Sequence, residues 1–194
     1  MVAIQSSPPR SDPVRGLIQA AVKGDQAAVE SLVRRSWPDL RRIAYLITQD
    51  QAAAEDIAQD SMLAALETLD RFDADRPLQP WLARIATNRS LDWLRRRRRL
   101  NETTSVEDTE EDPRLVADTA DVMRGAMPAD LLAALRGLSP EIRTAIVLRH
   151  LLDYEPAEIA ELFGVPASTI RSRIHRGLHS LRRVLDDPEK GSNA

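Results

Sequence analysis

The segment PAEIAELFGVPASTIRSRIHRGLHSLR, residues 156–182, has the pattern of a helix-turn-helix. Ala160 is small where two helices must approach closely, and Gly164 can adopt the left-handed conformation that the turn requires. Ile170 follows six residues later, where it would anchor the second helix in the core. Further apolar residues expected to pack at helical spacing are Ile174, Leu178, Leu181 and Leu185. The pattern predicts two short helices, the second with one apolar face.

The opposite face of that second helix carries hydrogen-bond donors and cations, and residues 164–182 contain no Asp or Glu. A helix in the major groove needs such a face, because donors contact base edges while cations contact phosphates. The candidate DNA-contacting residues are Ser168, Thr169, Arg171, Ser172, Arg173, His175 and Arg176. The alternative is a solvated arginine-rich helix, but the combined features favour DNA binding. His175 and His179 lie four residues apart without a third ligand nearby, so we expect no metal site.

The charges of the chain are strongly segregated, although its formal net charge is only -3. Residues 84–99 hold seven arginines and one acid, whereas residues 102–121 hold eight acids and one arginine. Local fields of this kind matter more than net charge for binding a polyanion. The chain has no cysteine, which excludes disulfides and thiolate metal sites. The N-terminus has no apolar signal core and no run reaches about 20 apolar residues, so we expect a cytoplasmic protein without direct membrane insertion.

The 194 residues show helical periodicity and little alternation with period two, so we predict an all-α fold. We expect two small helical domains over residues 12–99 and 129–186, joined by an acidic flexible linker at 100–128, with tails at 1–11 and 187–194. The expected local features are a helix from Pro13 to about Val22, a break at Gly24–Asp25, caps at Asp50 and Ser139, a buried stripe of Ile57, Leu63, Leu66 and Leu69, a loop at 73–80 and a helix beginning near Pro80.

Two blocks of the first predicted domain carry polar side chains at helical spacing. In AEDIAQDSMLAALETLDRF (residues 54–72), a polar cluster spans about one and a half turns, which by charge alone is typical of a solvated face. In RPLQPWLARIATNRSLDWLRRRRR (residues 76–99), Arg84, Asn88 and Asp92 share one helical line. Asn and Arg can bond base edges, and the arginine run can hold phosphates. Trp81 could stack on an unpaired base, but its spacing with Leu and Ile favours the core.

These blocks, in this order, resemble an extracytoplasmic-function (group IV) sigma factor of the sigma-70 family of bacterial RNA polymerase. Residues from Ala54 to Arg98 resemble region 2 through AED-x-x-Q-D and WLARIATN-x-x-x-D-x-L-R. Residues from about Leu131 to Leu185 resemble region 4 through LSPEIRTAIVLRHLLDYEPAEIAELFGVPASTIRSRIHRGLHSLR. The resemblance implies a transcription-initiation factor that binds core polymerase, reads a duplex -35 element and captures an opened -10 element. It implies no catalytic centre and no cofactor.

The resemblance also assigns roles to the candidate residues. The polymerase-binding surface, which would dock on the beta-prime clamp while region 4 meets the beta flap, comprises Glu55, Asp56, Gln59 and Asp60. The -10 contacts would be Asp75, Arg76, Leu78 and Gln79 in the base-capturing loop and Arg84, Asn88, Arg89, Asp92 and Arg95 along the strand path. Of the -35 residues named above, Arg171, Ser172, His175 and Arg176 would lie nearest the bases. Leu78 stands where many relatives carry an aromatic residue, and His175 is less typical of this helix.

The resemblance further implies that the acidic linker threads the polymerase cleft and RNA exit path, although a solvated tether remains an alternative. It also implies an anti-sigma factor as a partner. Two other functions remain open: a stand-alone helix-turn-helix regulator that binds duplex DNA without polymerase, usually at a two-fold symmetric site, and a polymerase-binding regulator that does not touch DNA. The carboxylate-free helix argues against the second.

Overall fold

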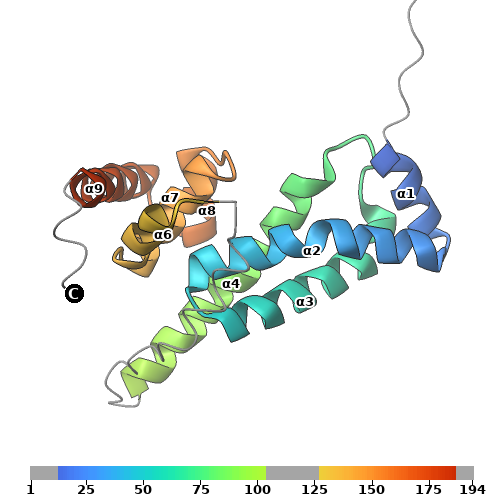
Figure 1. Cartoon of the computed structure of the whole chain (residues 1–194), viewed down its shortest axis with the longest axis horizontal. Coiled ribbons are helices and arrows are strands. Elements are labelled where there is room, and N and C mark those ends of the chain that lie inside the picture. The colour runs from blue at the N-terminus through green and yellow to red at the C-terminus, as the bar shows by residue number, and fades with distance from the viewer. Residues whose placement is uncertain (1–12, 104–126, 187–194) are drawn as a thin grey trace, which may run out of the picture.

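The computed structural model describes residues 13–103 and 127–186, which are helical and contain no strand (Figure 1). This confirms the all-α prediction. The elements are α1 Pro13–Val22, α2 Gln26–Thr48, α3 Gln51–Glu67, the 3-10 turn η1 Leu69–Arg71, α4 Leu78–Thr103, α6 Ala129–Arg136, α7 Pro140–His150, α8 Pro156–Phe163 and α9 Ala167–Leu185. The predicted tails and most of the predicted linker lie outside the described residues. None of the helices in the described ranges combines the length and apolarity that a membrane crossing needs.

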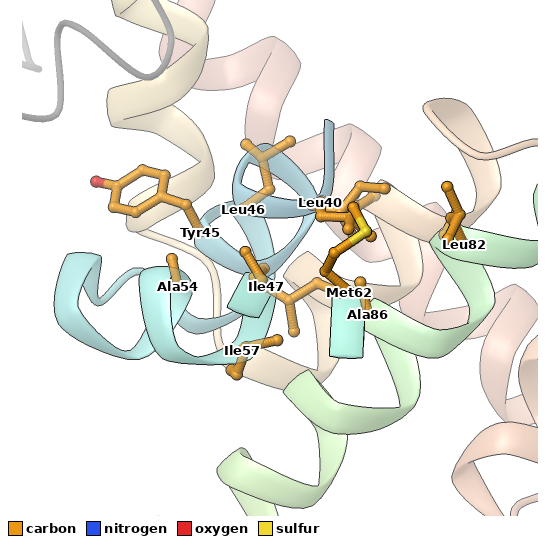
Figure 2. Packing of buried hydrophobic residues seen from close by; sticks show 14 of the residues in the cluster. Leu40, Tyr45, Leu46, Ile47, Ala54, Ile57, Met62, Leu82 and Ala86 are labelled. Atoms are coloured by element: carbon orange, nitrogen blue, oxygen red, sulfur yellow. The ribbon is translucent and has the colours of Figure 1, made fainter. Parts of the chain in front are cut away.

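The first four helices form a bundle in which α2 packs against α1, α3 and α4. Figure 2 shows its core, where Leu40 and Ile47 of α2 meet Met62 of α3 and Ala86 of α4. The caps follow the sequence: Asp25 accepts hydrogen bonds from the backbone N–H groups of Ala27 (2.9 Å) and Ala28 (3.2 Å). Asp50 likewise accepts from the N–H of Ala53 at 2.9 Å, so both predicted breaks are confirmed.

The fourth helix differs from the prediction at both ends. It begins at Leu78 rather than near Pro80, because Pro80 lies in the first turn, where the backbone N–H has no intrahelical partner to lose. It continues to Thr103, beyond the predicted boundary at residue 99. Arginine is a good helix former, so the arginine run continues the helix instead of ending it.

The last four helices form the second bundle, in which α8 and α9 are the predicted helix-turn-helix. Gly164 has φ 64°, the left-handed conformation that its position predicted. Ile170 is fully buried and Leu181 is buried. Leu185, in the last turn of α9, was expected in the core but is 37% exposed. Ser139 occupies the predicted cap position, but its side chain makes no capping hydrogen bond.

Helix α9 approaches α7 closely at Gly177. A Cβ atom at this position would lie 2.8 Å from Ile142 Cγ2 and 2.8 Å from Ile146 Cγ1. The missing side chain therefore allows α9 to pack directly on α7. This contact fixes the orientation of the polar face of α9 relative to its own bundle.

Candidate polymerase and nucleic-acid interfaces

The predicted polymerase-binding residues share one exposed face of α3. The buried face of the same helix is made by small and apolar side chains, including Ala54, Ile57 and Ala58. The exposed set is Glu55, Asp56, Gln59 and Asp60. Two arginines of the same bundle approach this patch: Arg41 Nη1 lies 3.8 Å from Glu55 Oε1, and Arg89 Nη1 lies 3.5 Å from Asp60 Oδ2.

Leu63 extends this polar patch by one turn with an apolar side chain. It was predicted to belong to the buried stripe, but it is 53% exposed. The reason is its spacing: Leu63 lies three residues after Asp60 and seven after Asp56, which places it on their face of the helix. The face is therefore acidic at one end and apolar at the other.

The strand-path residues of α4 lie along one outward line. Arg84, Asn88 and Asp92 are exposed, while Leu82, Ala86 and Leu91 bury the opposite face. The other two members of the set are held by carboxylates: Arg89 by Asp60, and Arg95 by Asp92, with Arg95 Nη1 2.7 Å from Asp92 Oδ1. The structure thus leaves Arg84, Asn88, Asp92 and Arg95 exposed, whereas Arg89 is half-buried and turns toward Asp60 of α3.

Trp81 is half-buried and packs on Phe72, with the ring centroids 4.8 Å apart. Its predicted place in the core is confirmed.

The predicted base-capturing loop contains exposed and buried members. Asp75 and Arg76 are exposed, as is Gln79 in the first turn of α4. Asp75 Oδ1 pairs with Arg15 Nη1 at 2.6 Å, which ties the loop to α1. Leu78 is only 5% exposed and belongs to the core, so it does not share the surface of the other three. A buried side chain anchors the loop and is not available to contact a base.

The predicted -35 residues lie on α9, and most of them face solvent. Ser168, Arg171, Ser172, His175 and Arg176 are exposed, and Thr169 is half-buried. Arg173 differs, because its guanidinium stacks over the Phe163 ring at 5.3 Å and lines a cleft between the two bundles.

This interdomain cleft has a volume of about 730 Å³ and lies between α4 and the second bundle. Its arginine lining is Arg95, Arg97, Arg98, Arg143 and Arg173. The sequence did not predict this cleft, because only the packing of the two bundles creates it. The arginine run at residues 95–99 indicated a strongly basic surface but not its shape or its other lining residues.

Tyr154 lies between α7 and α8 and packs against the small buried cluster of the second bundle that includes Ile159 and Ile170. Burial raises the pKa of its hydroxyl above the usual 10.0, while the positive charge of Arg84 acts in the opposite direction and Glu158 adds to the increase. Arg84 of the strand path therefore lies within electrostatic range of the second bundle.

Comparison with known proteins identifies both bundles. Residues 32–100 match the family model of Sigma-70 region 2, and residues 129–181 match that of Sigma-70 region 4. The chain is 31% identical over 188 residues to the ECF RNA polymerase sigma factor SigW of Bacillus subtilis, covering 90% of this chain and 97% of SigW. This chain belongs to the ECF sigma factors of the sigma-70 family.

Two further relatives agree with this membership. The sigma factor is 35% identical over 179 residues to SigE of Mycolicibacterium smegmatis, which covers 90% of this chain and 69% of SigE. A solved structure of CnrH in complex with the cytosolic domain of CnrY aligns with a TM-score of 0.56 and 27% identity, over 90% of this chain and 98% of that chain. The protein is therefore a transcription initiation factor that works with RNA polymerase and not an enzyme, and the stand-alone regulator is not favoured.

Proposed function

We propose that this sigma factor divides its work among three exposed helical surfaces. The acidic face of α3 docks on the beta-prime clamp, the outer line of α4 and the loop before it capture the opened -10 element, and α9 reads the -35 duplex. The observation that carries this proposal is that most members of the three residue sets are exposed, and that the sets lie on three separate elements: α3, α4 with the loop before it, and α9. The proposed domains are residues 12–99 and 129–186, with the linker at 100–128 between them, and the protein would act in the cytoplasm.

The α3 surface suits a basic and partly apolar partner. Asp56 and Asp60 supply negative charge, Gln59 supplies an amide, and Leu63 adds an exposed apolar contact on the same face. Interfaces with an apolar centre and a charged rim combine stable packing with electrostatic steering. Leu63 is therefore an addition to the four predicted polymerase-binding residues.

The α4 surface suits a single strand of DNA. Asn88 can bond a base edge, while Arg84, Arg89 and Arg95 can hold phosphates. A flipped base would meet Asp75, Arg76 and Gln79 beside the start of α4. Extruding a base costs a few kcal/mol, which these contacts would offset. Leu78 serves this site by anchoring the loop from within the core.

The α9 surface suits the major groove of duplex DNA. Arg171 and Arg176 can contact guanine edges or phosphates, and Ser172 and His175 add donors between them. The second bundle would also meet the beta flap of core polymerase. We propose an anti-sigma factor as a further partner, because the similar protein CnrH is bound by CnrY in its solved structure.

The test is run-off transcription with bacterial core polymerase on a fragmented genomic library. We expect wild-type protein to give discrete start sites and the Asp56→Arg, Asp60→Arg double variant to give none, because two reversed charges would oppose docking. Glu30→Arg is the matched control: it reverses the charge of an exposed carboxylate on α2, outside the α3 face, and should transcribe normally. Equal transcription by the double variant would refute the α3 assignment.

A second pair of variants tests the α9 assignment. Arg171→Ala and Arg176→Ala should each weaken binding to the selected -35 duplex by about ten- to a hundredfold, as expected when a bidentate contact to a base is lost. Arg183→Ala, which changes an exposed arginine beyond the set, is the control. Tight binding of the free chain to a two-fold symmetric duplex, without any polymerase-dependent transcript, would instead support the stand-alone regulator.

A further inference from the structure

The interdomain cleft between α4 and the second bundle has a strongly basic lining. Among the described residues that line it, five are arginines and one, Glu141, is acidic. Three of the arginines, Arg97, Arg98 and Arg143, belong to none of the proposed surfaces. The volume of about 730 Å³ lies within the range of about 300–1,000 Å³ that small-molecule sites occupy. The cleft therefore has the size and the charge of a site for a small anionic ligand.

Two of the lining arginines stack on aromatic rings. The guanidinium carbon of Arg97 lies 5.0 Å from the centre of the Trp93 ring, and that of Arg173 lies 5.3 Å from the centre of the Phe163 ring. A guanidinium that stacks on a ring uses its planar face for this contact and keeps the N–H donors at its edge for other partners. Arg97 already directs one donor to Asp50, with Nη1 3.2 Å from Oδ2. Arg173 is therefore the better placed of the two to contact a ligand.

Arg173 also has a buried donor that the protein does not use. Its Nη1 makes no hydrogen bond to any described residue. Buried donors in folded proteins nearly always have an acceptor, because an unsatisfied donor loses its hydration without compensation. A phosphate suits this donor, since a guanidinium bonds two phosphate oxygens in parallel and the opposite charges strengthen the pair. The unsatisfied donor therefore indicates a ligand that carries phosphate.

Gln49, in the lining of the same cleft, supplies a second unsatisfied group, which is an acceptor. Its Nε2 donates to the backbone oxygens of Tyr45 at 3.3 Å and Leu46 at 3.1 Å. These two acceptors fix the orientation of the amide, because only its NH2 group can donate. The Oε1 atom is buried and accepts no hydrogen bond from the described residues. A ligand group beside it must therefore be a donor, such as a hydroxyl or an amino group.

Apolar side chains, including Leu91, Leu94 and Val165, complete the lining. A nucleotide matches all three features, because it combines phosphates, hydroxyl and amino donors, and a planar base that packs on apolar groups. Inorganic phosphate lacks the last two. We propose that the cleft binds a nucleoside di- or triphosphate, with Arg173 contacting the phosphates and Gln49 accepting a hydrogen bond from a hydroxyl or amino group.

Arg95 belongs both to the lining of the cleft and to the proposed strand path of α4. A bound nucleotide would therefore compete with the opened -10 strand for this side chain, and promoter capture would respond to a small molecule. This consequence rests on the proposed function, whereas nucleotide binding by the free chain does not.

Isothermal titration calorimetry of the full chain tests the site. The probes are ATP and GTP, with tripolyphosphate, adenosine and sulfate for comparison. We expect saturable binding of both nucleotides. Tripolyphosphate and adenosine should each bind at least tenfold more weakly than ATP, because each lacks one of the two groups that the cleft is proposed to recognise.

Two variants locate the bound nucleotide in the cleft. Arg173→Gln should weaken binding of ATP and of tripolyphosphate by at least tenfold, since both lose a charge-assisted hydrogen bond. Gln49→Met, which keeps the length of the side chain but has no amide oxygen, should weaken ATP and leave tripolyphosphate unchanged. Arg183→Gln is the matched control: it removes an exposed arginine of the same helix outside the lining, and its affinity should equal that of the wild type. Circular dichroism of each variant checks that the fold is retained.

The absence of saturable nucleotide binding would overturn the proposal, as would equal affinities for ATP and sulfate. Wild-type affinity in a folded Arg173→Gln variant would place the nucleotide elsewhere and overturn it too. The shared role of Arg95 is tested by adding ATP to a complex of the chain with a single-stranded oligonucleotide of the -10 sequence found by run-off transcription. ATP should displace the oligonucleotide, and simultaneous binding of both would refute the competition. If the oligonucleotide does not bind at all, the proposed -10 surface fails, while calorimetry still decides whether the cleft binds nucleotides.

Discussion

Replacing Gly177 with alanine probes how closely the recognition helix packs on its neighbour. The added Cβ would lie 2.8 Å from both Ile142 Cγ2 and Ile146 Cγ1, and 3.0 Å from Ile146 Cδ1. Cγ2 and Cγ1 are attached directly to the β-carbons of these isoleucines, so they cannot move aside without a change of rotamer or of helix position.

The expected magnitude follows from two opposing effects. Alanine is favoured over glycine inside a helix by about 1 kcal/mol. Overpacking a well-packed core costs about 1–3 kcal/mol, and contact with two β-branched side chains points to the upper part of that range. We therefore expect the free energy of unfolding of the second domain to fall by about 1–2 kcal/mol. For a domain of this size, each kcal/mol lowers Tm by roughly 4–8 °C.

The measurement is urea and thermal unfolding followed by far-ultraviolet circular dichroism and by tryptophan fluorescence. All three tryptophans, Trp37, Trp81 and Trp93, lie in the first domain, whereas Gly177 lies in the second. The dichroism transition should therefore shift more than the fluorescence transition.

Gly16→Ala is the matched control for this experiment. Gly16 is also inside a helix, but a Cβ there would meet nothing within 4 Å. This substitution should raise stability by about 0.5–1 kcal/mol. If Gly177→Ala were as stabilising as Gly16→Ala, the direct packing of α9 on α7 would be refuted.

Three further substitutions have defined outcomes. Asp25→Ala removes the acceptor for two backbone N–H groups and should lower the free energy of unfolding in urea by about 1 kcal/mol. An unchanged free energy would contradict the role of Asp25 as a cap. Gly164→Ala should cost about 1–2 kcal/mol in thermal unfolding because φ is 64°, although no atom obstructs the new side chain. Burial raises the pKa of Tyr154, so its contribution to stability is complete below the unfolded pKa of 10.0 and is lost as pH rises toward the folded value. Tyr154→Phe has no hydroxyl to ionise, so its free energy of unfolding should fall less than that of the wild type as the pH rises above 10.0. Urea unfolding below and above pH 10.0 measures this difference.

Local patterns predicted the helices and the turn. Gly164 and Ile170 indicate the helix-turn-helix because the turn needs a left-handed residue and the second helix needs a buried anchor at that spacing. Asp25 and Asp50 cap helices by accepting hydrogen bonds from backbone N–H groups two or three residues later. These features depend on residues close together in sequence. The family resemblance then supplied the roles that composition and spacing left open.

Long-range packing explains what the sequence did not show. Leu63 looked like a core residue because it is apolar and follows Ile57, but it shares the face of Asp56 and Asp60, and no helix covers that residue in the described structure. Leu78 looked like a loop residue because two prolines flank it, yet it folds into the core. The contact between Arg143 and Ile47 joins residues 96 positions apart, and no local pattern marks it.

Because the arginine run at residues 95–99 is helical, its side chains point in different directions. Successive residues of an α-helix point about 100° apart, so neighbouring arginines face different parts of the molecule. Arg95 reaches Leu162, Arg97 reaches Asp50 at 3.2 Å and Arg98 reaches Glu141. Removing one arginine from the run would hardly alter its composition, but it would rotate every later residue onto another partner. The register of this segment, more than its charge, is therefore the property that mutation would disturb.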